Sequence, residues 1–328
     1  MDVAAPTNTT LDHIAQVVLS ADTICVCGHV NPDGDCIGSV LALASALRSL
    51  NKHVYPLCVE SVDQNRSFQD LPGSEHLIKP SDLSLAPELF ISVDVSNDER
   101  LGSAADTKAS ASHSIIIDHH VVEGVDADLA YIVPSAPSTT MLIWDLIEDL
   151  GVERTKEIAT CCFFGLMTDT GGFRHANSSK EAFEYAAAMV ERGANAHMLS
   201  DAFFQRRSFA SVKLEERLIE RIHLFCDDGA ALSFVTQADL DALGATKADC
   251  EPLIDVLRSL DGVKISCILK AFDGAVRGSL RSKDGIDVNA IARKLGGGGH
   301  KLASGFTLDC PLEDAIVQVE RLIEDACN

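Results

Sequence analysis

Four hydrophobic runs in the first half of the chain end at acidic or histidine residues. The four segments cover residues 29–35 (HVNPDGD), 93–96 (VDVS), 118–120 (DHH) and 167–170 (MTDT). Carboxylates and imidazoles at the ends of buried elements are costly unless an opposite charge neutralises them. Because two divalent cations would neutralise these groups, the four segments indicate a metal site as well as the ends of buried elements.

Short runs rich in Val and Ile alternate with helical patterns across this half of the chain. Buried strands are predicted at residues 23–27, 53–59, 89–93 and 114–117, and helices at 37–50, 138–150 (with Ser138 or Thr139 as N-cap), 155–167 and 179–192. This βαβ alternation predicts an α/β fold, with a mostly parallel sheet and flanking helices. Ligands gather at the carboxyl ends of such strands, where three of the four segments fall. The fourth follows a buried helix, which places Asp169 at the helix end.

A chain of 328 residues is long enough for two hydrophobic cores. We expect a catalytic domain over residues 1–193, a helical linker over 194–224 and a smaller α+β domain over 225–328. In the last part, strands are predicted at 231–235, 263–269, 275–282 and 304–308, and helices at 250–260, 288–295 and 312–326.

The composition is that of a globular protein, with 46% hydrophobic residues. The sequence shows neither a signal peptide nor an apolar run of about eighteen residues, so a cytoplasmic protein without membrane contact is expected. Most of the eleven cysteines lie in apolar runs. The pairs Cys25/Cys27 and Cys161/Cys162 lack zinc-knuckle spacing, so the cysteines are expected to be buried free thiols.

The formal net charge is −22, with a pI of about 4.7. Such a surface repels phosphate backbones, which argues against binding long duplex nucleic acid through a broad basic face. Small anionic substrates remain compatible with the charge if metal ions and a few arginines reverse the field locally.

The candidate metal ligands combine oxygen and nitrogen donors. Asp33, Asp35, Asp94 and Asp169 carry four negative charges, which match two divalent cations, and His29 and His119 add a nitrogen each. This donor set favours Mn²⁺, two ions per chain, with Co²⁺, Fe²⁺ or Mg²⁺ as substitutes. Two such ions about 3.5–4 Å apart would hold a bridging hydroxide suited to in-line attack on phosphorus.

Each segment also has a simpler interpretation. Asp33 and Asp35 could belong to a turn that caps the helix starting near residue 37, and Asp94 could cap the turn that follows it. The adjacent histidines of DHH are expected to point to opposite sides of the strand end. One would bind a metal and the other would face substrate, with Asp118 orienting a ring. Next to Asp169, Arg174 and His175 could meet an anion or form an exposed helix end.

The C-terminal domain carries a second candidate site. Gly297, Gly298 and Gly299 belong to a run of four glycines whose backbone amides can form an anion nest, and His300 and Arg281 supply side-chain donors. The alternative is a flexible turn between a helix and a strand. We expect phosphate binding here.

With these motifs, the chain resembles the DHH phosphoesterase superfamily, in the branch with a DHHA1 domain, and specifically the bifunctional oligoribonucleases and pAp phosphatases (NrnA-type). The resemblance covers about residues 21–308 and lacks no motif residue. It implies one metal on His29, Asp33 and Asp94, and another on Asp35, Asp94, His119 and Asp169. It further implies that His120 contacts the scissile phosphate and that Arg281 and His300 hold a terminal phosphate. Mn²⁺, a cleft between the domains and a homodimer follow from the same resemblance.

The expected activity is Mn²⁺-dependent hydrolysis of very short RNA and of 3′-phosphoadenosine 5′-phosphate (pAp), with His120, Asp118 and Asp94 in catalysis. Hydrolysis of pyrophosphate or of pGpG is the alternative within the same class, and a non-catalytic nucleotide sensor is the alternative outside it. Relatives of the RecJ type are longer and have an added nucleic-acid-binding domain. Family II pyrophosphatases have a different C-terminal signature, so both fit this chain less well.

Overall fold

The computed structural model describes residues 7–59, 66–95, 97–121, 124–283 and 285–327. The chain forms two compact units, Met1–Gln205 and Arg206–Asn328. Their boundary falls inside the stretch 194–224, for which the sequence predicts a helical linker. Helix α8 (Ala196–Ser200) belongs to the first unit, while α9 (Phe209–Glu220) packs into the core of the second. Among the described residues, no helix is both long and apolar enough to cross a membrane.

The first unit is built on a five-stranded sheet in the order β2-β1-β3-β4-β5, in which every neighbouring pair is parallel. Its strands are β1 (Thr23–Cys27), β2 (His53–Leu57), β3 (Leu89–Val93), β4 (His113–Asp118) and β5 (Leu129–Ile132). The predicted parallel α/β fold is therefore confirmed. The four predicted strands are present, and β2 ends two residues earlier than expected. Strand β5 was not predicted, because its four residues are too few to show a pattern.

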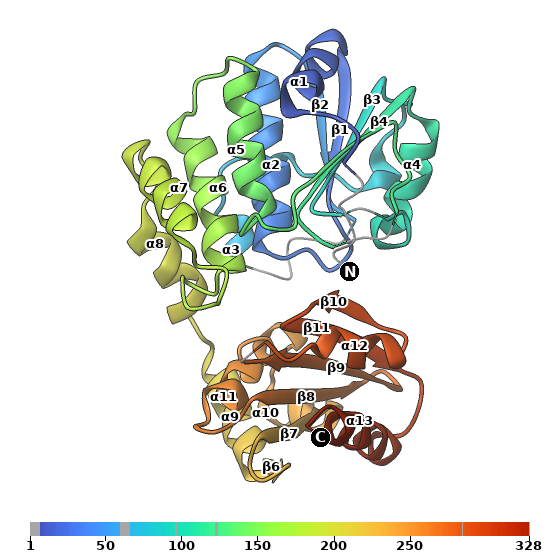
Figure 1. The fold of residues 1–328 in the computed structure, drawn as a ribbon, viewed down its shortest axis with the longest axis vertical. Helices are drawn as coiled ribbons and strands as arrows, with labels where there is room; N and C mark the ends of the chain where they lie inside the picture. Colours follow the sequence, from blue (N-terminus) through green and yellow to red (C-terminus); the bar gives the residue numbers. More distant parts are fainter. Residues whose placement is uncertain (1–6, 60–65, 96, 122–123, 284, 328) are drawn as a thin grey trace. The chain divides into compact units, whose positions relative to one another are not determined.

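Helices cover both faces of this sheet (Figure 1). On one face lie α1 (Leu11–Ser20), α2 (Gly34–Ser49), α5 (Thr139–Asp149) and α6 (Lys156–Asp169), with α7 (Lys180–Glu191) packed on α6. On the other lie the 3₁₀ turn η4 (Glu99–Ala104) and α4 (Ala105–Ser110). The unit also contains α3 (Arg66–Gln69), η2 (Ser74–His76), η3 (Pro80–Asp82) and the π-helical turn η5 (Asp201–Gln205). Alternation along β1 sends Ile24 and Val26 to the first face and Cys25 and Cys27 to the second.

All eleven cysteines are free thiols, and eight of them are buried. Burial raises the pKa of Cys25 to about 12, so this thiol stays protonated at neutral pH. The eight buried cysteines therefore pack as small hydrophobic side chains, as the sequence predicts, whereas Cys226, Cys310 and Cys327 are partly or fully exposed.

Glycines allow α2, α5 and α6 to approach one another closely. A Cβ at Gly38 of α2 would lie 2.5 Å from the carbonyl oxygen of Cys161, and one at Gly165 of α6 would lie 2.5 Å from Thr140. No side chain fits at either position. This close packing fixes the helices that carry Asp35 and Asp169.

The second unit contains a six-stranded sheet in the order β10-β11-β9-β8-β7-β6. Its strands are β6 (His223–Phe225), β7 (Ala230–Thr236), β8 (Ile265–Phe272), β9 (Ala275–Ser282), β10 (Gly298–His300) and β11 (Ala303–Leu308). Only β7 and β8 pair in parallel. Helices α12 (Val288–Lys294) and α13 (Leu312–Cys327) pack on one face, and α9, α10 (Gln237–Leu243) and α11 (Leu253–Ser259), with the turn η6 (Lys247–Cys250), pack on the other. The predicted α+β arrangement is confirmed, but β6 and β10, which have three residues each, were not predicted.

Candidate active site

The loop after β1 brings His29 and Asp33 together. Asp33 is the N-cap of α2, and its Oδ1 accepts a hydrogen bond of 3.0 Å from the Cys36 amide. Its other oxygen lies 3.6 Å from Nε2 of His29. The capping interpretation of Asp33 is therefore correct, and capping leaves the second carboxylate oxygen facing the histidine.

Asp35 is buried in the first turn of α2 and caps a different helix. Its two oxygens accept hydrogen bonds from the amides of Thr139 (2.6 Å) and Thr140 (2.9 Å) at the start of α5. Ser138 occupies the N-cap position of α5 without a capping hydrogen bond, and its hydroxyl contacts that of Thr140. The predicted N-cap position is therefore confirmed at Ser138, but the Asp35 carboxylate of α2, and not the Ser138 hydroxyl, accepts the hydrogen bonds of these amides.

Asp94 follows β3 and lies at the centre of the site. It has a φ of +60°, which is unfavourable for a residue other than glycine and typical of functional positions. The Thr139 hydroxyl donates to its Oδ1 at 3.0 Å. The next turn is capped by Asn97, which accepts a hydrogen bond from the Arg100 amide, so the capping alternative for Asp94 is wrong.

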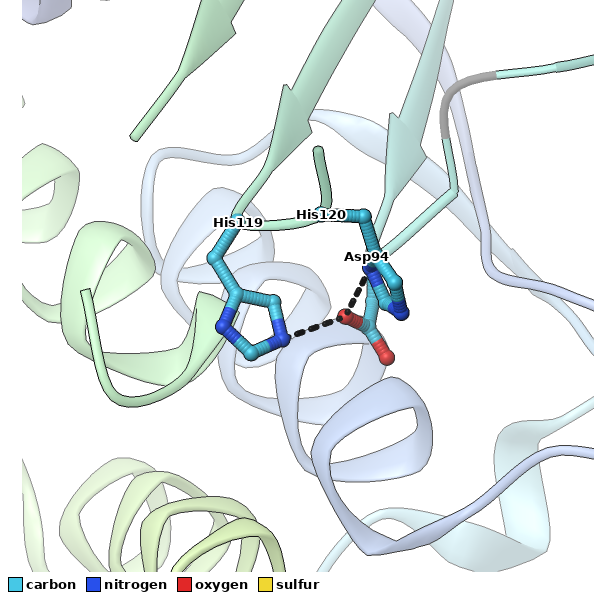
Figure 2. Close-up of side chains that lie close together, drawn as sticks. All are labelled: Asp94, His119 and His120. Carbon is cyan, nitrogen blue, oxygen red and sulfur yellow. Dashed lines mark ion pairs between the residues drawn. The ribbon is translucent and has the colours of Figure 1, made fainter. Parts of the chain in front are cut away.

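His119 and His120 converge on Asp94 (Figure 2). Nε2 of His119 and Nδ1 of His120 lie 3.5 Å and 3.6 Å from the same oxygen, Oδ1 of Asp94. The expectation that the two rings point to opposite sides is wrong. Strand β4 ends at Asp118, whose Oδ1 accepts hydrogen bonds from both histidine amides and bends the backbone there.

Backbone carbonyls orient two of the imidazoles. Nδ1 of His29 contacts the oxygen of Val30 at 2.8 Å, and Nδ1 of His119 contacts that of Ala136 at 3.0 Å. A carbonyl oxygen can only accept, so Nδ1 carries a proton in each ring, which leaves Nε2 as the nitrogen that can bind a metal ion once it is deprotonated. In both histidines Nε2 faces the aspartates.

Asp169 is the last residue of α6, as the sequence predicts. Its Oδ2 lies 3.3 Å from Nε2 of His119, which is also 3.8 Å from Oδ2 of Asp35. Asn177, which the sequence reasoning missed, fixes this corner, because its side-chain amide donates to the carbonyl oxygens of Asp169 and Pro137. Thr139, which the sequence suggests only as an N-cap, was missed as a site residue as well. Asn177 lies close in sequence to Arg174 and His175, but Thr139 lies far from every predicted site residue, so the sequence offers a signal for Asn177 alone.

The ligand atoms form two groups, His29, Asp33 and Asp94 on one side and Asp35, His119 and Asp169 on the other. A third group, Asp94, His119 and His120, joins them, and within each group the ligand atoms lie within 4.8 Å of one another. Oδ2 of Asp94 is 3.4 Å from His29, whereas Oδ1 faces His119. Nε2 of His29 and Oδ2 of Asp94 are buried without a hydrogen bond among the described residues. Buried polar atoms of this kind require a partner, and divalent cations fit this set of donors.

Burial and the closeness of several carboxylates shift the pKa values of the aspartates and histidines in this site. Burial and the charge of Asp94 raise the pKa of Asp35 to about 7, and burial likewise raises that of Asp169 well above its usual value. Burial would lower the pKa of His29, but Asp33 and Asp94 outweigh it and raise the pKa to about 10. The pKa of His119 is raised to about 10 in the same way, chiefly by Asp169. The site therefore holds excess negative charge, which protons offset when no cation is bound.

Two family models match the chain: the DHH family N-terminal domain over residues 23–166, and the DHHA1 domain over residues 230–327. The bifunctional oligoribonuclease and PAP phosphatase NrnA of Thermus thermophilus is 31% identical, and the match covers 90% of this chain and 87% of the relative. The chain belongs to the DHH family. It is a DHH phosphoesterase with a C-terminal DHHA1 domain.

Two solved structures are similar to this DHH protein. An exopolyphosphatase-related protein from Bacteroides fragilis has a TM-score of 0.89 at 25% identity, covering 97% of this chain and 96% of that one. RecJ from Thermus thermophilus, solved in complex with Mn²⁺, has a TM-score of 0.56 at 16% identity. The match covers 99% of this chain and 55% of RecJ. Because the identity is only 16%, this likeness shows the fold alone.

In the DHHA1 domain, Arg281 lies half-buried on β9. Burial lowers the pKa of its guanidinium, and Nη1 donates to the carbonyl oxygen of Leu280 at 3.0 Å. Among the described residues, it has no ion pair with a carboxylate. A partly buried arginine of this kind is suited to an anionic ligand.

The glycine run is not an open loop. Gly298 and Gly299 belong to β10, and the Gly297 amide donates to the carbonyl oxygen of Ala292 at 2.8 Å. A Cβ at Gly297 would lie 2.1 Å from the Gly305 oxygen, so β11 requires glycine there whether or not an anion binds. The flexible-turn alternative is therefore wrong. The side chain of His300 lies outside what the structure describes.

The side chain of Arg174 contacts Gly171 and Phe204 among the described residues, and not the proposed metal ligands. It is exposed, its Nε donates to the carbonyl oxygen of Gly171 at 2.6 Å, and its guanidinium lies 5.3 Å from the ring of Phe204. Its role in substrate binding stays a prediction. The neighbouring His175 packs under Gly171, where a Cβ would meet its ring at 2.2 Å, so this residue forms part of the turn.

Proposed function

We propose that the protein is a Mn²⁺-dependent phosphoesterase that hydrolyses short oligoribonucleotides and pAp. The observation that carries this proposal is the position of Asp94, which presents one oxygen to each of two groups of histidines and carboxylates. The printed activity of the NrnA relative, oligoribonuclease and PAP phosphatase, supports the choice of substrates.

The residues that would hold the ions follow from the two groups. One ion would bind His29, Asp33 and Asp94, and the other Asp35, Asp94, His119 and Asp169. Mixed imidazole and carboxylate ligation suits Mn²⁺, which the RecJ relative binds in its solved complex. When bound, two such ions supply Lewis-acid charge and lower the pKa of water so that it can attack phosphorus at neutral pH.

His120 is the residue we assign to the reacting phosphate. Asp118 accepts a 2.7 Å hydrogen bond from its Nδ1, so Nε2 is the nitrogen with which His120 would meet a phosphoryl or leaving oxygen. Burial opposes ionisation of Asp118, but His120 and His119 hold its pKa below the usual value. An ionised Asp118 keeps the proton on Nδ1 and stabilises a charged imidazole.

The DHHA1 domain would bind the end of the substrate. Residues 1–205 contain 11 Lys and Arg against 29 Asp and Glu, whereas residues 206–328 contain 16 against 20. The second unit is therefore far less repulsive to phosphate. Arg281, with His300 and the glycine backbone at residues 298–299, would bind a terminal phosphate and so restrict the substrate to short lengths, whereas the Gly297 amide is already bonded to Ala292. A homodimer and a cytoplasmic location stay expectations from the sequence.

Product release from pAp, a 5′-phosphorylated dinucleotide, pGpG and pyrophosphate, each with added Mn²⁺, tests the proposal. Release of phosphate from pAp and of mononucleotides from the dinucleotide is the expected result. Asp94→Asn should lower both rates by at least about a thousandfold, because it weakens both groups of ligands at once. Asp106→Asn on the exposed face of α4 removes the same charge away from the site and should leave the rates unchanged.

Other outcomes separate the alternatives. Turnover of pyrophosphate or pGpG alone would favour the same-class alternative, and tight nucleotide binding without turnover would favour a sensor. Wild-type rates in Asp94→Asn would overturn the two-ion assignment.

A further inference from the structure

One side of the sheet in the DHHA1 domain is open beyond α11. Residues along β9 alternate: Val276 and Leu280 are buried in the core beneath α12 and α13, whereas Arg277, Ser279 and Arg281 point to the other side. Their partners on β11 are Thr307, Gly305 and Ala303. All six of these residues are exposed or half-buried. This side of β9 and β11 is therefore accessible to a ligand.

Arg277 and Arg281 define the two ends of this open face. Four residues apart on one strand, their Cα atoms are about 13 Å apart, and both side chains leave the same face. Between them lie Ser279 and, directly opposite it on β11, Gly305. Because these residues are small, an extended ligand can lie across the face and reach both guanidinium groups.

Arg277 carries a positive charge without an ion-pair partner among the described residues. It pairs across the strands with Lys270, and like charges in direct opposition destabilise a sheet. Lys270 has its own partner, Glu251, at 2.7 Å. The nearby carboxylate of Asp273 is ion-paired with Lys247. The guanidinium of Arg277 is therefore available to an anionic ligand.

We propose that Arg277 binds a second substrate phosphate, distinct from the terminal phosphate at Arg281, and thereby sets the preference for oligonucleotides over pAp. This assignment rests on the proposed function. pAp carries one phosphate besides the one that is hydrolysed, whereas a longer oligonucleotide carries further phosphates, one of which can reach Arg277. The guanidinium would bind it in a bidentate manner, and Thr307, paired with Arg277 across β9 and β11, offers a hydroxyl donor.

Binding measurements on the full chain test this assignment without relying on turnover. Dissociation constants would be measured for pAp and for 5′-phosphorylated RNAs of two, three and five nucleotides, in an Asp94→Asn background over a series of salt concentrations. Arg277→Gln should weaken binding of the trinucleotide and pentanucleotide about tenfold and that of pAp less than about twofold. The slope of log K against log salt should fall by about 0.7 for the longer RNAs, the value for one phosphate contact on a single strand.

Two further variants complete the design. Arg277→Lys keeps the charge and should restore the salt slope. Arg321→Gln removes one exposed charge from α13, on the covered side of the sheet, and should change nothing. An equal loss for pAp and pentanucleotide, or no loss for either, would overturn the assignment. Failure of the wild-type protein to hydrolyse any of these substrates would count against the proposed function and not against this contact.

Discussion

The Asp118 carboxylate accepts a hydrogen bond of 2.7 Å from Nδ1 of His120, while His120 lies 3.6 Å from Asp94. Asp118 thus holds the imidazole at the edge of the proposed metal ligands, to which Asp118 itself is not assigned. Partners that orient a catalytic ring in this way typically contribute about 10–100-fold to activity.

Replacing Asp118 with Asn tests this relationship. The amide keeps an acceptor for the backbone hydrogen bonds but loses the charge that fixes the proton on Nδ1. We expect kcat to fall about 10–100-fold with KM little changed, and the content of bound Mn²⁺ to stay at the wild-type level in elemental analysis. Loss of Mn²⁺ in parallel with activity would instead make Asp118 a metal ligand.

Thermal stability of the metal-free protein should decrease as pH rises from about 6 to 8.5. The pKa of Asp35 in the folded protein is about 7, against about 3.9 in an unfolded chain, so this carboxyl favours folding only while protonated. His29 and His119 have folded pKa values of about 10, so their contribution is present below about pH 6.5 and is lost as pH rises through 10. For Asp35, His29 and His119 alike, a rise in pH lowers the free energy of unfolding.

Melting temperatures in EDTA and in MnCl₂ would measure this effect. Raising the pH should lower the melting temperature in EDTA by at least about 2 °C and should not lower it in MnCl₂, because the ions replace the protons. Asp106→Asn should show the wild-type dependence. An EDTA curve that is flat with pH would contradict the assigned ionisation.

Binding of Mn²⁺ should release protons. Nε2 of His29 and His119 must be deprotonated before it can ligate, and the raised pKa of each ring places a proton there at pH 7. Calorimetric titrations in buffers with different ionisation enthalpies should give a release of at least about two protons per chain at pH 7, one from each ring and a further fraction from Asp35 and Asp169, and the affinity should increase with pH. A binding enthalpy independent of the buffer would show that the rings are already neutral.

The sequence predicted the elements that approach the site better than the contacts within it. The bounds of β1 and β3 were correct because both strands are short runs that are buried throughout, apart from the partly exposed Thr23. His29 and Asp94 could be brought together from the sequence because the carboxyl ends of neighbouring parallel strands meet at one edge. Strands β5, β6 and β10 were missed because runs of three or four residues are too short to show a period in the sequence.

Contacts between side chains that lie far apart in the sequence could not be predicted from it. Asp35 caps a helix that begins 104 residues later, so no local pattern could show that Ser138 would leave this role to it. The convergence of His119 and His120 depends on the hydrogen bonds of Asp118 to their amides. Likewise, the glycines of residues 297–299 suggested an anion nest, whereas their spacing from β11 could be seen only in three dimensions.

Gly38→Ala tests whether close packing of α2 on α6 maintains the metal ligands. The added Cβ would lie 2.5 Å from the carbonyl oxygen of Cys161, a backbone atom that cannot move without shifting α6. We expect a loss of about 1–3 kcal/mol in the free energy of unfolding, measured by urea denaturation, despite the higher helix propensity of Ala. Because α2 carries Asp35 and α6 carries Asp169, the affinity for Mn²⁺ should decrease as well. Gly124→Ala is the control, since its Cβ would meet no atom of the described residues within 4 Å, and it should change neither quantity. Wild-type stability together with weakened Mn²⁺ binding would show that α6 shifts at little cost in free energy. If stability and Mn²⁺ affinity were both unchanged, the close contact between α2 and α6 would not be required.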